Sequence, residues 1–385
     1  MNKFTSIFFF LFLFAGSNIH PTENFTVSLW LHSSMFSNLK VDAIKELNEK
    51  LSYYREIGVE NLYVFKTLKK EHKKGWSFLK QILKIAHKKD LKVHPIITPG
   101  QRVKIEGKIK RNGDWLIKDQ FGKILPYLNL SNPEARYYVL KKVKKLLKYN
   151  IDGIHLDYIR FPYLSPKKSG DTIMSFNIGV LNVMFRNFIP DHIYHQTSDN
   201  YFSYDKETLE SFEKYYHNLE SIDPENGQIV LNEWRLWNAL NVTKLVRSIR
   251  KVILESGNRI PLSAAVMSNH EFALHSLGQD WGTWGWNSFV DVLCPMIYSN
   301  DNNWFKERLK GVLDNVQEKC KVYAGIAIKS SSNHNTPDGV REQIKIAKEL
   351  GADGVVLFSG YSLSEEYRLA IKEKVEGKSK KYEKD

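Results

Sequence analysis

The sequence predicts an α/β fold, a (β/α)8 TIM barrel with a long insertion after strand 4. Two observations lead to this prediction: eight short apolar runs alternate with stretches of helical periodicity, and no glycine-rich phosphate loop follows an early run. The missing loop disfavours a doubly wound open sheet, the alternative fold for such an alternation. A chain of 385 residues that is 42% hydrophobic can bury the core of a barrel.

The apolar runs are rich in β-branched residues and nearly continuous, as strands covered on both faces are. The predicted strands are Val27–His32, Asn61–Lys66, Leu91–Ile97, Gly153–Asp157, Pro261–Met267, Val290–Tyr298, Lys321–Ile328 and Gly354–Ser359. The helices expected between them are Asp42–Ile57, Gly75–Lys88, Ser131–Leu147, Asn241–Glu255 and Asp338–Leu350. Together these elements predict one barrel domain at residues 18–365.

The spacing has one large irregularity, about a hundred residues between Asp157 and Pro261, where a simple strand–helix unit needs far fewer. Residues 163–230 of this interval are polar, aromatic and poor in strand pattern. An insertion after a barrel strand lies over the C-terminal mouth, where the active sites of such barrels are found. We therefore expect this insertion to border a functional site.

The two ends of the chain differ in composition from the barrel. Residues 1–17 combine a lone Lys3, an apolar run and small residues at the cleavage positions, Ala15 and Ser17, which predicts a secretory signal peptide. An uncleaved anchor is the alternative. Residues 366–385 are expected to form a charged tail. Export predicts a periplasmic, cell-surface or extracellular location.

The net charge of +13 fits either lysine-rich helix faces or electrostatic association with an anionic cell envelope. Nucleic acid is a poor candidate because no basic run is interleaved with aromatic residues. Cys294 and Cys320 lie in apolar contexts and are expected to be buried thiols. No HExxH motif or cysteine cluster is present, so we expect neither a metal nor another cofactor.

The fourth predicted strand carries the first candidate site residue. Because strand side chains alternate, Gly153, His155 and Asp157 share the face toward the barrel interior, while Ile154 and Leu156 face the helices. Asp157 then lies at the carboxyl end and faces the mouth, with His155 one layer below.

Two further charged residues flank this strand. Asp152 lies at its opposite end, where we interpret it as a turn or cap residue. Arg160 follows Asp157 by three positions and either forms only an ion pair or keeps Asp157 ionised, as a nucleophile or stabiliser must be.

Polar and aromatic residues also mark the ends of other strands. Trp30 lies at the end of the first, Asn269 and Glu271 follow the fifth, and Tyr298 and Asp301 lie at or after the sixth. Core packing is the alternative for each aromatic residue taken singly. As a set at one rim, they suit sugar hydroxyls and the apolar faces of pyranose rings, and so predict a saccharide cleft.

Several motifs resemble those of the glycosyl-hydrolase-like family 10 proteins, bacterial envelope proteins with a TIM-barrel glycosidase domain. In order, they read DGIHLDYIRFPY, YFSYDKETLESF, EWRLWNALNVTKLVRSIRKVI, LSAAVMSN, GQDWGTW, VDVLCPMIYSND and YAGIAI. The resemblance runs from about Val27 to Tyr361. It implies an exported glycoside hydrolase that acts on a bacterial polysaccharide, with peptide-free cell-wall glycan or a related exopolysaccharide as the substrate.

The resemblance also implies site residues. Asp157, the aspartate of the D-Y-x-R-F-P signature, would be the central carboxylate. Signature matches and strand-end positions together give these substrate-binding candidates: Trp30, His155, Arg160, Asn269, Trp281, Tyr298 and Asp301. In chitinase-type barrels the same strand carries its own acid, but His155 and Ile159 occupy the corresponding carboxylate positions here.

The proton donor must therefore come from elsewhere in the chain. Glycosidases need a second, protonated carboxyl group. Position past the fifth strand favours Glu271 and the motif favours Asp280, while Glu233 and Asp301 are further candidates; a cap or loop hydrogen bond is the alternative role for each.

Two rival functions remain. A non-catalytic glycan-binding barrel at the cell envelope would keep the cleft without the second carboxyl group. An enzyme acting on another bond, such as a deacetylase, would need a metal.

Overall fold

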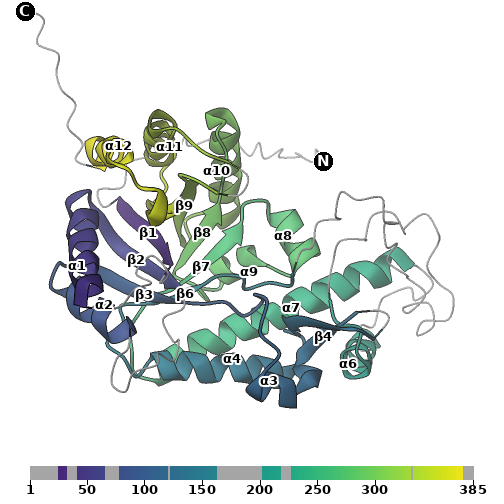
Figure 1. Ribbon diagram of the computed structural model, residues 1–385. Helices are drawn as coiled ribbons and strands as arrows, with labels where there is room; N and C mark the ends of the chain where they lie inside the picture. The colour runs from purple at the N-terminus through teal and green to yellow at the C-terminus, as the bar shows by residue number, and fades with distance from the viewer. Residues whose placement is uncertain are drawn as a thin grey trace, which may run out of the picture.

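Figure 1 shows the computed structural model, which describes residues 25–32, 41–65, 78–119, 122–162, 202–217, 227–330 and 333–375. The signal segment predicted at 1–17 and much of the insertion predicted at 163–230 lie outside the described residues. Among the described helices, none is long and apolar enough to cross a membrane.

The strands form a closed parallel barrel in the order β1-β10-β9-β8-β7-β6-β3-β2. Their bounds are Thr26–His32 (β1), Val59–Phe65 (β2), Lys92–Ile97 (β3), Ile154–Leu156 (β6), Leu262–Met267 (β7), Val292–Met296 (β8), Lys321–Ala327 (β9) and Gly354–Phe358 (β10). The barrel closes where Thr26 pairs with Gly354. The predicted (β/α)8 fold is confirmed, and each predicted strand is present.

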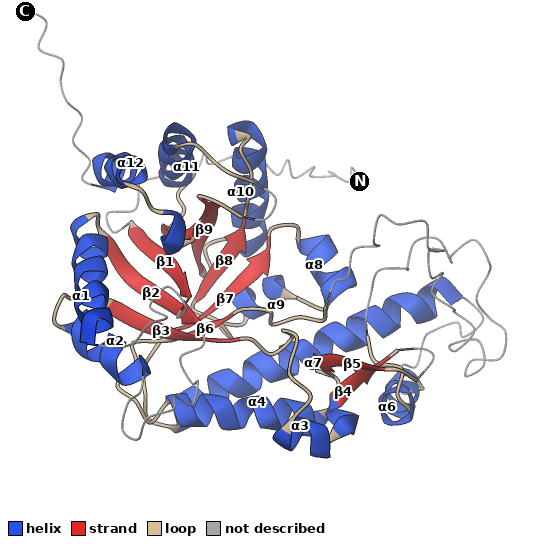
Figure 2. Cartoon of the chain, in the orientation of Figure 1, coloured by secondary structure: helices blue, strands red, loops and turns tan. Residues whose placement is uncertain are grey.

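Helices cover the outside of the barrel (Figure 2). Their bounds are Val41–Glu56 (α1), Phe78–His87 (α2), Pro133–Leu146 (α4), Gly227–Glu255 (α7), His270–Leu277 (α8), Trp281–Trp286 (α9), Asn302–Val316 (α10), Pro337–Glu349 (α11) and Glu365–Val375 (α12). Helix α12 begins one residue before the predicted charged tail (366–385) and continues into it, and its Tyr367, Ala370 and Ile371 are buried. The folded part therefore extends beyond residue 365, since α12 packs against α11.

Side-chain alternation divides the apolar residues into two layers. Leu29, Ile154 and Leu156 belong to the large cluster between strands and helices. Trp30 and Tyr63 belong to a smaller cluster inside the barrel. The predicted alternation on the fourth strand is confirmed, because strand side chains point to opposite faces in turn.

A side lobe extends from the barrel (Figure 1) and consists of a hairpin, helix α6 and the first half of α7. The hairpin is formed by β4 (Leu116–Lys118) and β5 (Ile124–Leu128), α6 spans Lys206–Tyr216, and α3 (Gly107–Arg111) and a 3-10 turn (Gly113–Trp115) precede the hairpin. Phe212 and Trp234 meet edge to face at 4.9 Å. The Tyr204 N–H bonds the Lys118 carbonyl at 2.9 Å, which ties the described part of the predicted insertion to a second insertion, after β3.

The sequence reading missed this second insertion and also placed the start of α7 too late. Helix α7 spans 29 residues, not the fifteen or so expected from Asn241. Its N-terminal half packs in the side lobe, where Trp234 and Trp237 stack at 5.4 Å, so its apolar face does not follow the barrel pattern.

Candidate functional site

The turn after β6 fixes the position of Asp157. The Asp157 N–H donates to the Ile97 carbonyl at 3.0 Å, so the backbone still pairs with β3 beyond the end of the strand. Tyr158 then adopts a left-handed φ of 49°, and its N–H donates to Asp157 Oδ1 at 2.7 Å. Gly100 passes directly beneath this turn, where a Cβ atom would lie 1.8 Å from the Arg160 carbonyl oxygen. The two loops thus hold the carboxylate at the mouth.

Burial controls the charge of Asp157, which is only 8% exposed. Desolvation raises its pKa from 3.8 to about 6, although the Tyr158 N–H bond and the nearby Arg160 guanidinium oppose the shift. The Arg160 guanidinium lies over the Tyr158 ring at 5.0 Å. Asp157 can therefore gain or lose a proton near neutral pH, which is a property of acid–base groups.

His155 lies one layer below and is completely buried. Trp30 Nε1 donates to His155 Nε2 at 3.0 Å, and His155 Nδ1 lies 2.8 Å from Ser263 Oγ. Burial lowers the pKa of His155 well below its usual range, so the ring is neutral. Because Nε2 accepts the indole N–H, the single proton sits on Nδ1 and points to Ser263. The ring stacks on Tyr63 at 4.1 Å.

Aromatic rings form one wall near Asp157. Tyr298 stacks on Phe358 at 5.5 Å, and the edge of Phe358 faces Trp30 at 6.3 Å. Burial raises the pKa of Tyr298 well above its usual range, and the charge of Asp157 adds to this, so the hydroxyl lies near the carboxylate and keeps its proton.

The other predicted polar residues cap helices. Asn269 accepts the Phe272 N–H at the start of α8, and Asp301 accepts the Asn303 and Trp304 N–H groups at the start of α10. Both are side-chain N-caps, which for Asp301 is the alternative that the sequence left open.

Asp280 caps α9 by accepting the Thr283 N–H at 3.2 Å, and it also lies 3.3 Å from His270 Nε2. Burial would raise the pKa of Asp280, but the hydrogen bonds from His270 and Thr283 outweigh it and lower the pKa. An ionised carboxylate cannot donate a proton, so the environment of Asp280 disfavours the role of acid.

Three of the candidates meet in a groove between α8, α9 and α10. This cavity of about 300 Å³ is lined by Asn269, Glu271 and Trp281, together with Trp304 and Arg308. Glu271 is exposed. The Arg160 guanidinium is the charged group that lowers the pKa of Asp157. The structure therefore forms two groups: Trp30, His155, Arg160 and Tyr298 around Asp157, and the α8–α10 groove.

Sequence reasoning missed Tyr63 and Ser263, which contact His155 beneath Asp157, and Phe358, which belongs to the aromatic wall. Each lies on the interior face of its strand, so the alternation that found His155 could have found them. A serine within the apolar run LSAAVM was the available signal. Within the described ranges, no cluster of three or more His, Cys, Asp or Glu side chains could hold a metal ion.

Comparisons with known proteins identify the fold. No protein-family model matches the chain, and no curated protein sequence matches it. Among solved structures, the catalytic domain of a β-amylase from Paenibacillus polymyxa matches with a TM-score of 0.56 and 12% identity over 91% of this chain and 98% of that one. A β-galactosidase from Rahnella sp. R3 matches with a TM-score of 0.57 and 11% identity, over 91% of this chain and 55% of the other.

A third similar structure is the β-galactosidase Gan42B from G. stearothermophilus, with a TM-score of 0.55, 10% identity, and coverage of 87% of this chain and 51% of that one. These neighbours are TIM-barrel domains of glycoside hydrolases. At such low identity the likeness shows a shared fold, and function must be argued from the site itself. Membership of the glycosyl-hydrolase-like family 10 stays a prediction.

Proposed function

We propose that this protein is an exported glycoside hydrolase that cleaves a bacterial polysaccharide, either peptide-free cell-wall glycan or a related exopolysaccharide. The observation that carries the proposal is Asp157, a buried carboxylate at the carboxyl end of a barrel strand with a pKa raised to about 6. Active sites of TIM barrels form at this end of the strands, and the solved structures of similar fold include glycosidase domains.

In the proposed mechanism, Asp157 acts as base or nucleophile. Above about pH 6 it is ionised, and Arg160 beside it favours this form. As a base, it removes a proton from the water that attacks the anomeric carbon; as a nucleophile, it forms the glycosyl–enzyme bond itself. The Tyr298 and Phe358 rings offer apolar faces for the sugar.

The second carboxyl group is proposed to be Glu271 or Asp280. It would protonate the leaving oxygen as the glycosidic bond breaks. The environment of Asp280 favours the ionised form. Glu271 is exposed in the first turn of α8 and is the better candidate of the two.

A second function competes with hydrolysis: a glycan-binding barrel without catalysis. The places of the two candidate acids favour it, because Asp280 caps α9 with a lowered pKa and Glu271 lines the α8–α10 groove. A binding barrel would keep the aromatic wall and need no proton donor.

The decisive experiment measures new reducing ends released from peptide-free cell-wall glycan and from exopolysaccharides, with co-sedimentation to measure binding. We expect the wild type to release reducing ends and Asp157→Asn to bind the same glycan without cleaving it. Full cleavage by Asp157→Asn would remove Asp157 from the mechanism. Binding without cleavage by the wild type on every glycan would establish the binding barrel.

A second pair of variants tests the proton donor. Asp280→Asn keeps the helix cap, because asparagine caps as well as aspartate does. A large loss of cleavage in Asp280→Asn would therefore assign catalysis to Asp280, whereas a loss confined to Glu271→Gln would assign it to Glu271.

The proposed location rests on residues 1–17, and association with an anionic envelope rests on the net charge of +13. Cell fractionation tests the first. Release of envelope-bound protein by salt tests the second, because screening weakens attraction between exposed charges.

A further inference from the structure

The α8–α10 groove lies on the outside of the barrel and begins at the mouth. Helix α8 contacts β7 and α9 contacts β8, and Figure 2 shows these helices beside the two strands. The lining of the groove includes Ser268 and Asn269, the first residues after β7. Because β7 pairs with β6, the strand that ends just before Asp157, the groove opens one strand away from that carboxylate.

The three helices approach one another closely at Gly282 on α9. A Cβ atom there would lie 3.0 Å from Asn315 Oδ1 on α10 and 3.0 Å from His270 Nε2 on α8. Asn315 and His270 both line the groove, whose volume is about 300 Å³. Small-molecule sites commonly have volumes of roughly 300–1,000 Å³, so the groove has room for a sugar unit but not for a long stretch of chain.

One face of α10 forms a wall of the groove. Its lining residues follow one another at steps of four, three and four positions, the spacing of a single helical face: Trp304, Arg308, Gly311 and Asn315. Trp304 is 42% exposed, although the Arg308 guanidinium lies over its ring at 5.1 Å. The guanidinium covers one face of the ring and holds it in place. An exposed indole held in this way is a surface on which the apolar face of a sugar ring can pack.

Gly311 leaves space in this wall. It lies in the interior of α10, where a glycine destabilises a helix relative to alanine. A Cβ atom at this position would meet no neighbouring element within 4 Å, so close packing does not require the glycine. Because Gly311 lines the groove, a larger side chain there would fill the cavity.

The polar lining of the groove suits an uncharged sugar. The exposed carboxylates of Glu271 and Glu307 share this lining with Arg308, so positive charge is not in excess and an anion is not favoured. Carboxylate oxygens accept hydrogen bonds from sugar hydroxyls, and the Asn315 amide can both donate and accept. Glu271 can accept such a bond whether or not it also donates a proton in hydrolysis.

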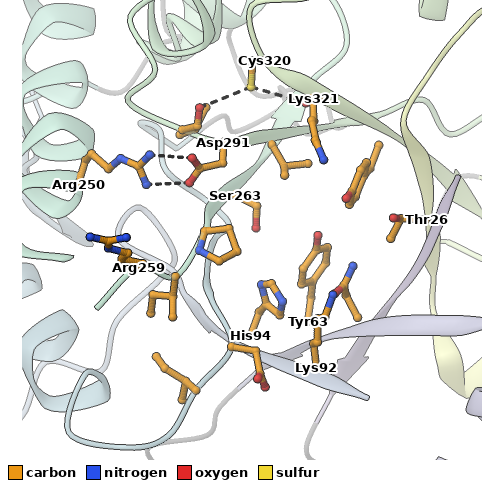
Figure 3. A pocket seen from close by; sticks show the side chains of 18 of the residues that line it. Thr26, Tyr63, Lys92, His94, Arg250, Arg259, Ser263, Asp291, Cys320 and Lys321 are labelled. Atoms are coloured by element: carbon orange, nitrogen blue, oxygen red, sulfur yellow. Dashed lines mark hydrogen bonds and ion pairs between the residues drawn. The ribbon is translucent and has the colours of Figure 1, made fainter. Parts of the chain in front are cut away.

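A larger cavity, of about 1130 Å³, lies at the N-terminal end of the barrel, but its polar groups serve the fold. Arg250 binds Asp291 there with two hydrogen bonds of 2.7 and 2.6 Å (Figure 3), and Asp291 Oδ2 also accepts the Leu262 N–H at 2.7 Å. Tyr63 and His94, which also line this cavity, are buried. The active sites of such barrels form at the opposite end, where the α8–α10 groove opens.

We propose that the α8–α10 groove is a second glycan-binding site, which holds a neutral sugar unit of the polysaccharide while another part of the same chain reaches Asp157. The sugar packs on the Trp304 indole, its hydroxyls bond Glu271 and Asn315, and Gly311 leaves the space that it occupies. Binding at two places raises the affinity for a polymer above that of either place alone. The identity of the glycan rests on the proposed function, but binding in the groove requires no cleavage.

Co-sedimentation with insoluble peptide-free cell-wall glycan and with chitin, a neutral polysaccharide, tests the proposal. Every protein carries Asp157→Asn, so that no glycan is cleaved during the measurement. Salt at about 1 M shortens the screening length to about 3 Å and suppresses attraction through the net charge of +13. We expect Trp304→Ala to weaken binding of at least one of the two glycans about tenfold, because the sugar loses its stacking surface.

Trp286→Ala is the matched control for Trp304→Ala. Trp286 is 47% exposed and lies under the Lys319 ammonium group as Trp304 lies under Arg308, but it is outside the lining of the groove. Glycan binding by Trp286→Ala should therefore equal that of the parent protein.

Gly311→Gln tests the cavity itself. The new side chain should fill the groove and weaken glycan binding at least about tenfold. It should also raise the midpoint of urea unfolding, since glutamine favours a helix interior more than glycine does, and this gain excludes misfolding as the cause of lost binding. Lys310→Gln is the matched control, because Lys310 is exposed on α10 outside the lining of the groove.

Three results would overturn the proposal: no binding of either glycan, unchanged binding in Trp304→Ala or in Gly311→Gln, or an equal loss in the control variants. The hydrolase fails by a different result, the absence of new reducing ends from the wild type. If the wild type releases none while Trp304→Ala and Gly311→Gln alone lose binding, the groove is a glycan-binding site on a protein that does not cleave its ligand.

Discussion

The two ends of the barrel each hold a buried titratable side chain, and burial shifts the two pKa values in opposite directions. At the C-terminal mouth the pKa of Asp157 rises to about 6; at the N-terminal end the pKa of His94 falls to about 4. The physical cause is the same, since loss of water disfavours the charged form of either group. Burial in the barrel thus favours the neutral form of both groups, which is the protonated carboxyl group of Asp157 and the unprotonated imidazole of His94.

The largest expected effect is on activity, and it is tested by the same Asp→Asn substitution made separately at the two ends of β6. Asp157→Asn should lower kcat/KM by at least about a thousandfold, because the mouth loses its central carboxylate. Asp152→Asn should keep the activity, because Asp152 binds the Val93 N–H and His87 at the other end. Kinetics on the cleaved glycan, with thermal unfolding as the check on folding, measure both. Equal losses of kcat/KM in the two variants would contradict the assignment of catalysis to Asp157 and of a structural role to Asp152.

Activity should follow the ionisation of Asp157. As base or nucleophile it works without its proton, so kcat/KM should fall about tenfold per pH unit below about pH 6 and level off above it. A pH–rate profile measures this. Activity that instead falls as the pH rises through 6 would mean that Asp157 acts as the acid and that another residue is the base.

Asp157 and His94 should make opposite contributions to the pH dependence of the free energy of unfolding. Between pH 3.8 and about 6, native Asp157 keeps a proton that the unfolded chain has lost, so this group's contribution falls as the pH rises. Between pH 6.5 and about 4, the unfolded chain protonates His94 and the native state does not, so this contribution falls as the pH falls. Each amounts to about 3 kcal/mol.

Single variants separate the two contributions. Asp157→Asn should make stability rise more steeply with pH between about pH 4 and 6.5 than in the wild type, and His94→Phe should flatten that rise. Urea unfolding across this range measures both. Parallel curves for the three proteins would mean that neither group changes its pKa on folding.

A smaller effect is expected from the hydrogen bond between the two ends. Trp30→Phe removes the donor to His155 Nε2 and leaves a buried acceptor unsatisfied, which should cost about 1–3 kcal/mol of unfolding free energy. Trp286→Phe is the matched control, since that indole is 47% exposed and bonds the Asn315 carbonyl. Similar losses of unfolding free energy in the two variants would mean that burial of the Trp30–His155 hydrogen bond does not increase its contribution to stability.

The smallest effect concerns the mouth residues that cap helices. Asp301→Ala should cost about 1 kcal/mol, and Asp301→Asn close to nothing, because asparagine preserves the cap. Chemical denaturation measures the difference. A large loss of activity in Asp301→Asn at unchanged stability would instead assign Asp301 to substrate binding.

The strands could be predicted because their signal is local. Short runs rich in β-branched residues, such as Leu262–Met267 and Gly354–Phe358, predict buried strands from their composition alone. Alternation of side chains along the fourth strand then predicts that His155 and Asp157 face the barrel interior. Asp152 was assigned to the structural end on the same basis, and its bond to the Val93 N–H confirms this.

Other features depend on contacts between distant segments. Nothing in the sequence near Ile124–Leu128 shows that this strand pairs with Leu116–Lys118 and that the hairpin packs against residues 202–217. Motif matching likewise could not separate capping from chemistry, because Asp280 suits either role by type alone. Whether a second carboxyl group lies near Asp157 depends on how the loops of the mouth are placed, and strand periodicity does not predict this.

The turn after β6 also limits what directed evolution could achieve on this strand. Ile159 occupies the position at which chitinase-type strands carry their acid, but its side chain is fully buried in the layer between strands and helices. Ile159→Glu would therefore place a charge in a dry, apolar layer and not at the mouth, at a cost of several kcal/mol. No single substitution there converts the strand into an acid–base pair, so engineering a new proton donor must begin from another loop of the mouth.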